Sequence, residues 1–116
     1  MIEEAFVSFE NAKLLKEKGF HNPTRNFYSD GEIVACDEID WNNSSFGHIS
    51  APTQQMVMRW LREVHNLHVD VDPSEGVWDP TVLELESWSS VADIPIQESY
   101  EESCEAAIKY CLENLI

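Results

Sequence analysis

Residues 50–72 read SAPTQQMVMRWLREVHNLHVDVD, and their hydrophobic pattern changes period partway along. In the first part, apolar residues recur three or four positions apart, which predicts a helix beginning near Ser50 or Pro52 and ending near Asn66. From there to Pro73, apolar and polar residues alternate, as in a strand with one buried face. The predicted buried stripe of the helix is Met56, Trp60, Leu61, Val64 and Leu67.

Local signals predict two further elements before this helix. Ser8 can cap a helix that runs to about Lys18, and Gly19 supplies the left-handed residue that follows its end. The pair Asp30-Gly31 predicts a hairpin between strands at 24–29 and 32–36. Residues 37–50 are predicted to form a long loop or an irregular extension of the hairpin, whose aromatic side chains serve either as core anchors or as a contact surface.

The C-terminal part of the chain predicts a second hairpin and a last helix. Residues 73–80 are rich in turn formers, and a partner strand is expected at 82–88. Ser99 and Glu102 form a capping box that opens the final helix. The order α-β-β-α-β-β-α predicts an α+β fold, with an antiparallel sheet of about four strands and helices packed mainly on one face. A chain of 116 residues fits one globular domain spanning 1–116.

The charge of the chain is concentrated in its C-terminal half. Residues 63–116 hold 13 acidic residues and one basic residue, Lys109, a local net charge of −12. The first 62 residues hold nine acidic and six basic residues, only −3. A surface of one sign repels nucleic acid and anionic lipid and attracts cations or a basic protein. We therefore expect no direct binding of nucleic acid and no membrane association.

Four carboxylates form the sharpest candidate site. If Leu83 faces the core, the pleat places Glu84 and Glu86 on the same outward face as Asp70 and Asp72, with Asp70 opposite Glu84 or Glu86. Like charges directly opposite each other destabilise a strand pair by a few tenths to about 1 kcal/mol. A cationic partner or a metal ion would offset that cost. The alternative interpretation is a solvated face that discourages edge-to-edge pairing.

The hypothesis that follows is a non-enzymatic accessory protein that contacts a basic protein partner. The expected contact surface adds Glu101 and Glu105, on the outer face of the last helix, to the four carboxylates of the hairpin. In its strongest form the protein mimics the phosphate array of DNA. The alternative is a structural or assembly protein that forms a homo-oligomer through exposed apolar or aromatic surface, including Trp41, Trp78 or Trp88.

The sequence predicts no metal, no cofactor and no catalytic residues. A calcium loop starting at Asp70 fails because Glu75 stands where glycine is needed and Thr81 where a bidentate Glu is needed. His65 and His68 could bind zinc, but no Cys-x-x-Cys accompanies them, and a charged His65 at a helix C-terminus is the simpler assignment. No nucleophile with a base, and no glycine-rich phosphate loop, is visible.

Compartment signals favour the cytoplasm. Acidic residues stand near Met1 where a signal peptide needs bases, and the longest apolar runs fall far short of the roughly 20 residues that cross a bilayer. Cys104 and Cys111 lie seven residues apart on one predicted helix, about 10 Å along its axis and too far for a disulfide. We expect a cytoplasmic protein with reduced thiols.

Three pairs of segments resemble a family of small uncharacterised proteins from phages and mobile elements of gut bacteria. They are residues 7–10 (VSFE) with 14–20 (LLKEKGF), 51–55 (APTQQ) with 60–63 (WLRE), and 100–102 (YEE) with 104–107 (CEAA). These motifs mark helix caps and core faces and cover about a third of the chain. The resemblance implies an accessory protein in a bacterial cytoplasm, and no functional residue is carried over from it.

Overall fold

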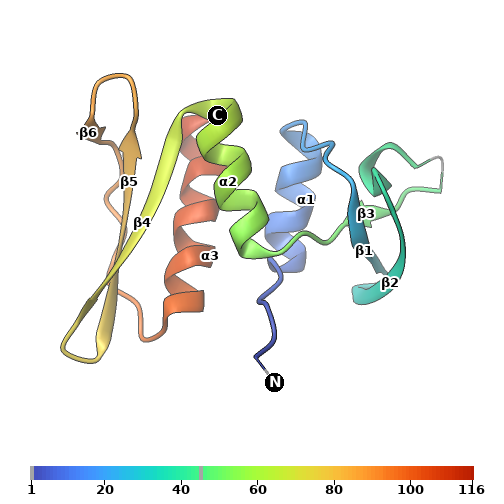
Figure 1. Cartoon of the computed structure of the whole chain (residues 1–116), viewed down its shortest axis with the longest axis horizontal. Coiled ribbons are helices and arrows are strands. Elements are labelled where there is room, and N and C mark those ends of the chain that lie inside the picture. The colour runs from blue at the N-terminus through green and yellow to red at the C-terminus, as the bar shows by residue number, and fades with distance from the viewer. Residues whose placement is uncertain (1, 45) are drawn as a thin grey trace. The chain divides into compact units, whose positions relative to one another are not determined.

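The computed structural model describes residues 2–44 and 46–116, which contain three α-helices and two three-stranded antiparallel sheets (Figure 1). The α+β class is confirmed. The expected single sheet of about four strands is wrong, because the two hairpins belong to separate sheets and each gains a short third strand. The chain divides into two compact units, residues 1–53 and 54–116. The single domain expected over 1–116 stays a prediction.

The helix of the first unit is set by its two caps. α1 spans Phe9–Glu17, and the Ser8 hydroxyl accepts a hydrogen bond from the Asn11 backbone N–H at 3.1 Å. Gly19 follows the helix with a φ of +87°, a conformation that costs glycine little. The predicted helix and both of its caps are confirmed.

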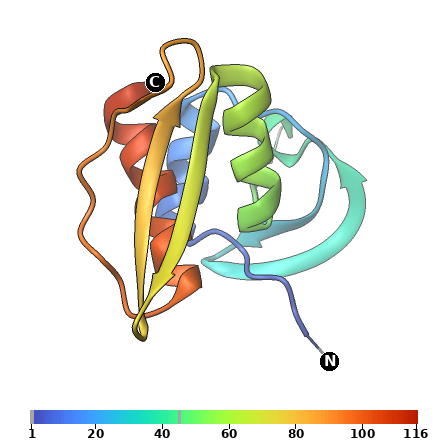
Figure 2. The same cartoon turned by 60° about the vertical axis from the view of Figure 1, so that its left-hand side comes forward.

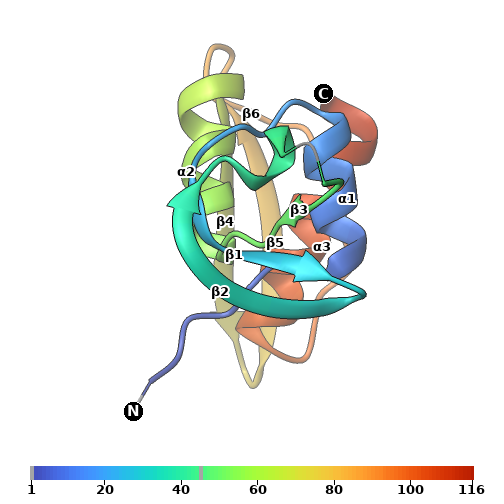
Figure 3. The same cartoon turned by 90° about the vertical axis from the view of Figure 1, so that its right-hand side faces the viewer.

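The sheet of the first unit has the order β2-β1-β3, with β1 at Thr24–Ser29, β2 at Glu32–Ile39 and β3 at Ile49–Ser50. Asp30 and Gly31, both at positive φ, form the predicted two-residue turn between β1 and β2. Figure 3 shows β2 as a long, strongly curved strand beside β1. The curvature accompanies a register shift opposite the start of β1.

The polar segment after β2 is anchored by one tryptophan. Trp41 begins a short 3-10 helix, η1, at Trp41–Asn43, and its Nε1 donates to the backbone oxygens of Thr24 at 2.9 Å and Asp37 at 3.1 Å. Its ring packs against Phe27 at 4.3 Å between centroids. Trp41 is therefore a core anchor, whereas Phe46 in the same segment is exposed.

The second unit begins with α2 at Gln54–His65. Its buried residues are Gln54, Val57, Met58, Trp60 and Leu61. Of the predicted stripe, Trp60 and Leu61 are buried on the helix, Leu67 is buried at the start of the following strand, Met56 is half-buried and Val64 is exposed. Val57 and Met58 are buried instead. Four apolar residues lie between positions 56 and 60, so spacing alone does not single out one stripe.

The sheet of the second unit has the order β4-β5-β6, with β4 at Leu67–Ser74, β5 at Val77–Glu84 and β6 at Ser89–Ser90. The turn between β4 and β5 consists of Glu75 and Gly76 alone, both at positive φ. The first strand therefore does not end at Pro73, and its partner begins at Val77 rather than at residue 82.

Pro73 and Pro80 are tolerated in this hairpin because their nitrogen atoms, which carry no hydrogen, do not face the partner strand. Pro73 belongs to the edge strand β4. On β5, the Trp78 N–H donates to the Gln97 oxygen at 2.9 Å, so Pro80, two residues on, turns its nitrogen to that same edge and away from β4.

The last helix, α3, spans Tyr100–Tyr110 and continues through one π-helical turn, η2, at Cys111–Leu115. Ser99 caps it by accepting from the Glu102 N–H at 3.1 Å, as predicted. Ser103 donates to the Trp78 oxygen at 3.0 Å and joins α3 to β5. In Figure 2 the helices of this unit lie on one side of β4 and β5.

The length and polarity of the helices decide whether any of them could span a membrane. In the part of the chain that the structure describes, no helix is long and apolar enough to cross a bilayer.

Candidate functional site

The register of β4 and β5 decides which side chains share the open face of the second sheet. Leu67, Val69 and Val82 are buried on the face toward the helices. On the other face, Asp70 lies opposite Thr81, and Asp72 lies opposite Asp79. Asp70 therefore does not lie opposite Glu84 or Glu86. The residues of β5 that face outward are shifted by one position from the predicted ones.

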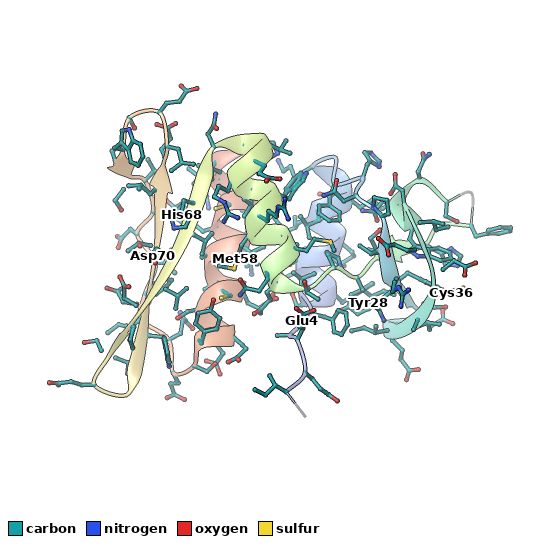
Figure 4. The ribbon with its side chains drawn as sticks, in the orientation of Figure 1. Glu4, Tyr28, Cys36, Met58, His68 and Asp70 are labelled. Atoms are coloured by element: carbon teal, nitrogen blue, oxygen red, sulfur yellow. The ribbon has the colours of Figure 1, made fainter. Side chains whose placement is uncertain are left out.

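We call Asp70, Asp72 and Asp79 the acidic hairpin face. All three are exposed on neighbouring strands of one hairpin. Figure 4 labels Asp70 on β4, and Figure 1 shows both helices of this unit on the opposite side of the sheet. An antiparallel sheet commonly leaves one face to solvent in this way.

The three carboxylates of the acidic hairpin face lack ion-pair partners among the residues that the structure describes. No Lys, Arg or His side chain of residues 2–44 and 46–116 forms an ion pair with any of the three carboxylates. Asp72 and Asp79 are direct cross-strand neighbours, an arrangement that costs a few tenths to about 1 kcal/mol when both are ionised. The face is complementary to a positively charged ligand.

Glu84 has a different role from the one predicted. It ends β5 opposite Leu67, and its carboxylate accepts from the backbone N–H groups of Glu86 at 3.1 Å and Ser87 at 2.8 Å, and from the Ser87 hydroxyl. The hydrogen bonds from Ser87 lower the pKa of Glu84. Glu84 thus holds the turn that follows β5.

The other predicted contact residues are dispersed. Glu86 is exposed in the turn at 85–88, and Glu101 is exposed in the first turn of α3. Glu105 accepts a hydrogen bond from Gln54 Nε2 at 3.1 Å and so takes part in the contact between α2 and α3. The six predicted carboxylates do not form one surface, and only Asp70 and Asp72 lie in the acidic hairpin face.

The sequence prediction omits Asp79, because the turn formers in residues 73–80 predict a turn there and not a strand. Val77, Asp79 and Thr81 alternate with Trp78 and Pro80, and that alternation was the available signal. The two prolines obscured it, since proline normally argues against a central strand.

Trp88 combines exposure with backbone strain. It lies in the turn between β5 and β6 with a φ of +58°, and 73% of its surface is accessible. A bulky residue in the left-handed region costs roughly 1–2 kcal/mol relative to the right-handed region. Among the tryptophans named for the assembly hypothesis, Trp41 is buried and Trp78 packs edge-to-face on Tyr100 at 5.5 Å. Trp88 is the exposed one of the three.

The histidines of the second unit do not support a metal centre. His65 packs edge-to-face on Trp60 at 4.7 Å, and burial lowers its pKa. This favours the neutral imidazole over the charged His65 that is the simpler assignment from the sequence. No three His, Cys, Asp or Glu side chains in the described ranges, 2–44 and 46–116, are grouped so that they could hold a metal ion.

The thiols divide by burial. Cys36 is exposed on β2, while Cys104 and Cys111 are buried among the helix contacts of the second unit. Burial raises the pKa of Cys111 to about 12, which leaves its thiol protonated near neutral pH.

Comparisons with protein-family models, with functionally curated proteins and with solved structures find no significant match to this chain.

Proposed function

We propose that this chain is a non-enzymatic binding protein whose acidic hairpin face contacts a basic surface on a partner protein. The observation that carries the proposal is the direct pairing of Asp72 with Asp79 on an open sheet face, next to Asp70 and without an ion pair to any of the described residues. A cationic partner would turn this repulsion into attraction. An accessory role of this kind agrees with the resemblance described above.

The local field supports the same proposal. Residues 63–116 carry a net charge of −12, so a cation that approaches the hairpin meets few repelling charges. Fields of this kind increase association rates most at low ionic strength. The contact should therefore weaken strongly with salt.

The test compares two triple variants of equal net charge. In one, Asp70, Asp72 and Asp79 become Lys, and in the control, Asp93, Glu98 and Glu113, which are exposed elsewhere in the same unit, become Lys. The proteins are immobilised and exposed to a bacterial lysate at about 0.1 M and about 0.5 M salt, where the Debye length is roughly 10 and 4 Å.

The proposal expects a partner that is held by the natural protein and the control at low salt, and is lost at high salt or with the face variant. Equal capture by both triple variants would contradict it, because net charge and not the hairpin face would then explain the binding. In the stronger form, mimicry of DNA, duplex DNA should compete for the captured partner.

The alternative, an assembly protein, also has a structural observation in its favour. Ile33, Val34 and Ile39 on β2 and Trp88 on the β5–β6 turn are exposed apolar side chains. Self-association through them would survive or increase at about 0.5 M salt. Sedimentation velocity of the protein alone at the two salt concentrations separates the two functions.

A further inference from the structure

β2 is an open edge of the sheet in the first unit. The strand order β2-β1-β3 places it outermost, and all eight of its residues are exposed (Figure 3). Among them, Ile33, Val34 and Ile39 have accessible fractions of 41%, 41% and 43%. Exposed apolar edge strands are templates for pairing with another chain.

The pairing of β1 with its two neighbours shows which backbone groups of β2 point to its open edge. The Asn26 carbonyl accepts a hydrogen bond on the β3 side of β1, at 2.9 Å. Successive residues of a strand direct their backbone groups to opposite edges, so Phe27 faces its partner Val34 on β2. The N–H and C=O groups of Ile33 and Ala35 therefore face away from β1 and are available to an added strand.

The charges of β2 discriminate between possible occupants. The strand carries Glu32, Asp37 and Glu38 and no basic residue. The Nε of Arg25 on β1 lies 3.7 Å from Oε2 of Glu38. A second copy paired along β2 would bring three more carboxylates to the same ribbon, from a chain of net charge −15. Like charges across strands repel, whereas Lys or Arg side chains would pair with these acids.

We propose that the β2 edge binds an extended basic segment of another protein as an additional strand. Backbone hydrogen bonds to Ile33 and Ala35 would hold the segment, with apolar side chains against Ile33 on one face of the strand and basic ones beside Glu32 on the other face. Strand addition of this type takes its affinity from main-chain bonds and its specificity from side chains. The site lies in residues 1–53 and does not depend on the proposed function of the acidic hairpin face.

The irregularity of β2 limits the length of the added strand. The pairing with β1 is regular from Glu32 to Ala35 and shifts register between Ala35 and Ile39. The added strand should therefore pair mainly with these first four residues, because a bulge twists the remainder of the edge.

The test uses a peptide probe of eight residues that alternates Lys and Val. A second peptide of the same sequence is N-methylated at its valines, whose N–H groups all lie on one edge of the extended peptide. A third peptide replaces Lys with Glu. Each is titrated into the full chain, and the amide resonances of Ile33 and Ala35 report the site. Alkylation of Cys36 gives an independent readout, since its thiol is exposed on β2 while Cys104 and Cys111 are buried.

The proposal expects the Lys-Val peptide to shift both amides and to slow the alkylation of Cys36. N-methylation should weaken binding about tenfold, because it removes main-chain donors that face β2. The Glu-Val peptide should leave both readouts unchanged.

Three results would overturn the inference. They are equal affinity of the N-methylated peptide, shifts confined to the acidic hairpin face, and a protein dimer whose β2 resonances move with protein concentration in the absence of peptide. Shifts confined to the acidic hairpin face would contradict the inference about β2 but leave the proposed function of that face intact. Binding at β2 alone would support the inference, and the comparison of the two triple Lys variants would still decide the proposed function.

A variant of the protein checks the same edge. Ala35→Pro removes a donor that faces away from β1, and Ala35→Ser is the matched control that keeps it. The Pro variant should lose about tenfold in affinity for the Lys-Val peptide and the Ser variant should not. Near-ultraviolet circular dichroism from the buried Trp41 confirms that both variants are folded.

Discussion

At the scale of single residues, Trp88 holds a conformation that its side chain disfavours. Its φ of +58° lies in the region that glycine occupies readily, and its ring is largely exposed. Strained residues often belong to functional sites, since ordinary selection for stability would replace them.

Replacing Trp88 with Gly should raise the free energy of unfolding by about 1 kcal/mol, because the left-handed strain disappears and little buried area is lost. Urea denaturation of the natural protein and the variant measures the change. Trp88→Ala is the matched control, since it removes the same ring but keeps the Cβ and the strain. A Gly variant no more stable than the Ala variant would show that the turn does not strain this residue.

His65 predicts a dependence of stability on pH. Burial lowers its pKa from the ordinary value of 6.5, so the unfolded chain binds the proton more readily than the folded protein does. The stabilising contribution of the neutral ring is complete above about pH 6.5 and is lost as the pH falls below that value.

The variant His65→Gln should therefore show a smaller loss of stability between pH 7 and 5 than the natural protein. Thermal unfolding at intervals of half a pH unit measures this loss. His68→Gln, on the neighbouring strand, is the control and should leave the pH dependence in place. If both variants behave alike, His65 is not the group that titrates.

At the scale of elements, the acidic hairpin face should reduce the stability of its own hairpin. Asp72 and Asp79 lie directly opposite each other, and both are exposed. Either Asp72→Asn or Asp79→Asn should stabilise the protein by a few tenths to about 1 kcal/mol in low salt.

A double-mutant cycle tests whether this repulsion is the cause. The double variant should gain less than the sum of the single gains, because the first substitution already removes the repulsion. The coupling should shrink in about 0.5 M salt. Additive gains at both salt concentrations would show that the two carboxylates do not interact.

The helices could be predicted from the sequence because their signals are local. Ser8, Gly19 and Ser99 set the ends of α1 and the start of α3, and each acts within a few residues of its own position. The Asp30-Gly31 turn is equally local. These elements match the prediction closely.

The second hairpin could not be predicted in the same way. Its turn uses Glu75 at a φ of +48°, a residue with little preference for that region, followed by Gly76. Val82 and Leu83 are both apolar, so alternation alone did not show which of them faces the core, and a shift by one residue exchanges the faces. On the open face, β5 therefore presents Asp79 in place of the predicted Glu84 and Glu86.

At the scale of the whole molecule, carboxylates outnumber basic side chains so strongly that most of them cannot form an ion pair within the chain. The chain has 22 acidic and seven basic residues. The ion pairs of Arg25 with Glu38 and of Arg59 with Glu63 are both largely exposed, and seven basic residues could neutralise fewer than a third of the 22 acids even if all were paired. Self-repulsion of this kind disfavours a compact state.

Moderate salt should therefore stabilise the natural protein. Raising sodium chloride from about 0.02 to 0.2 M shortens the Debye length from roughly 20 to 7 Å and screens the repulsion between unpaired carboxylates. The midpoint of thermal unfolding at pH 7 should rise over this range. The triple Lys variant of the acidic hairpin face should show a smaller rise, and an equal or larger rise would place the dominant repulsion elsewhere in the chain.

The two tight turns also bear on how the chain acquires its structure. β1 and β2 are separated by two residues, as are β4 and β5, so each pair of strands can meet after a very short loop closes. Hairpins form within about 1–10 μs, and contacts between near neighbours in sequence favour rapid folding. The slower step in the second unit should be the docking of α3, which must return across residues 85–99 to reach β4 and α2.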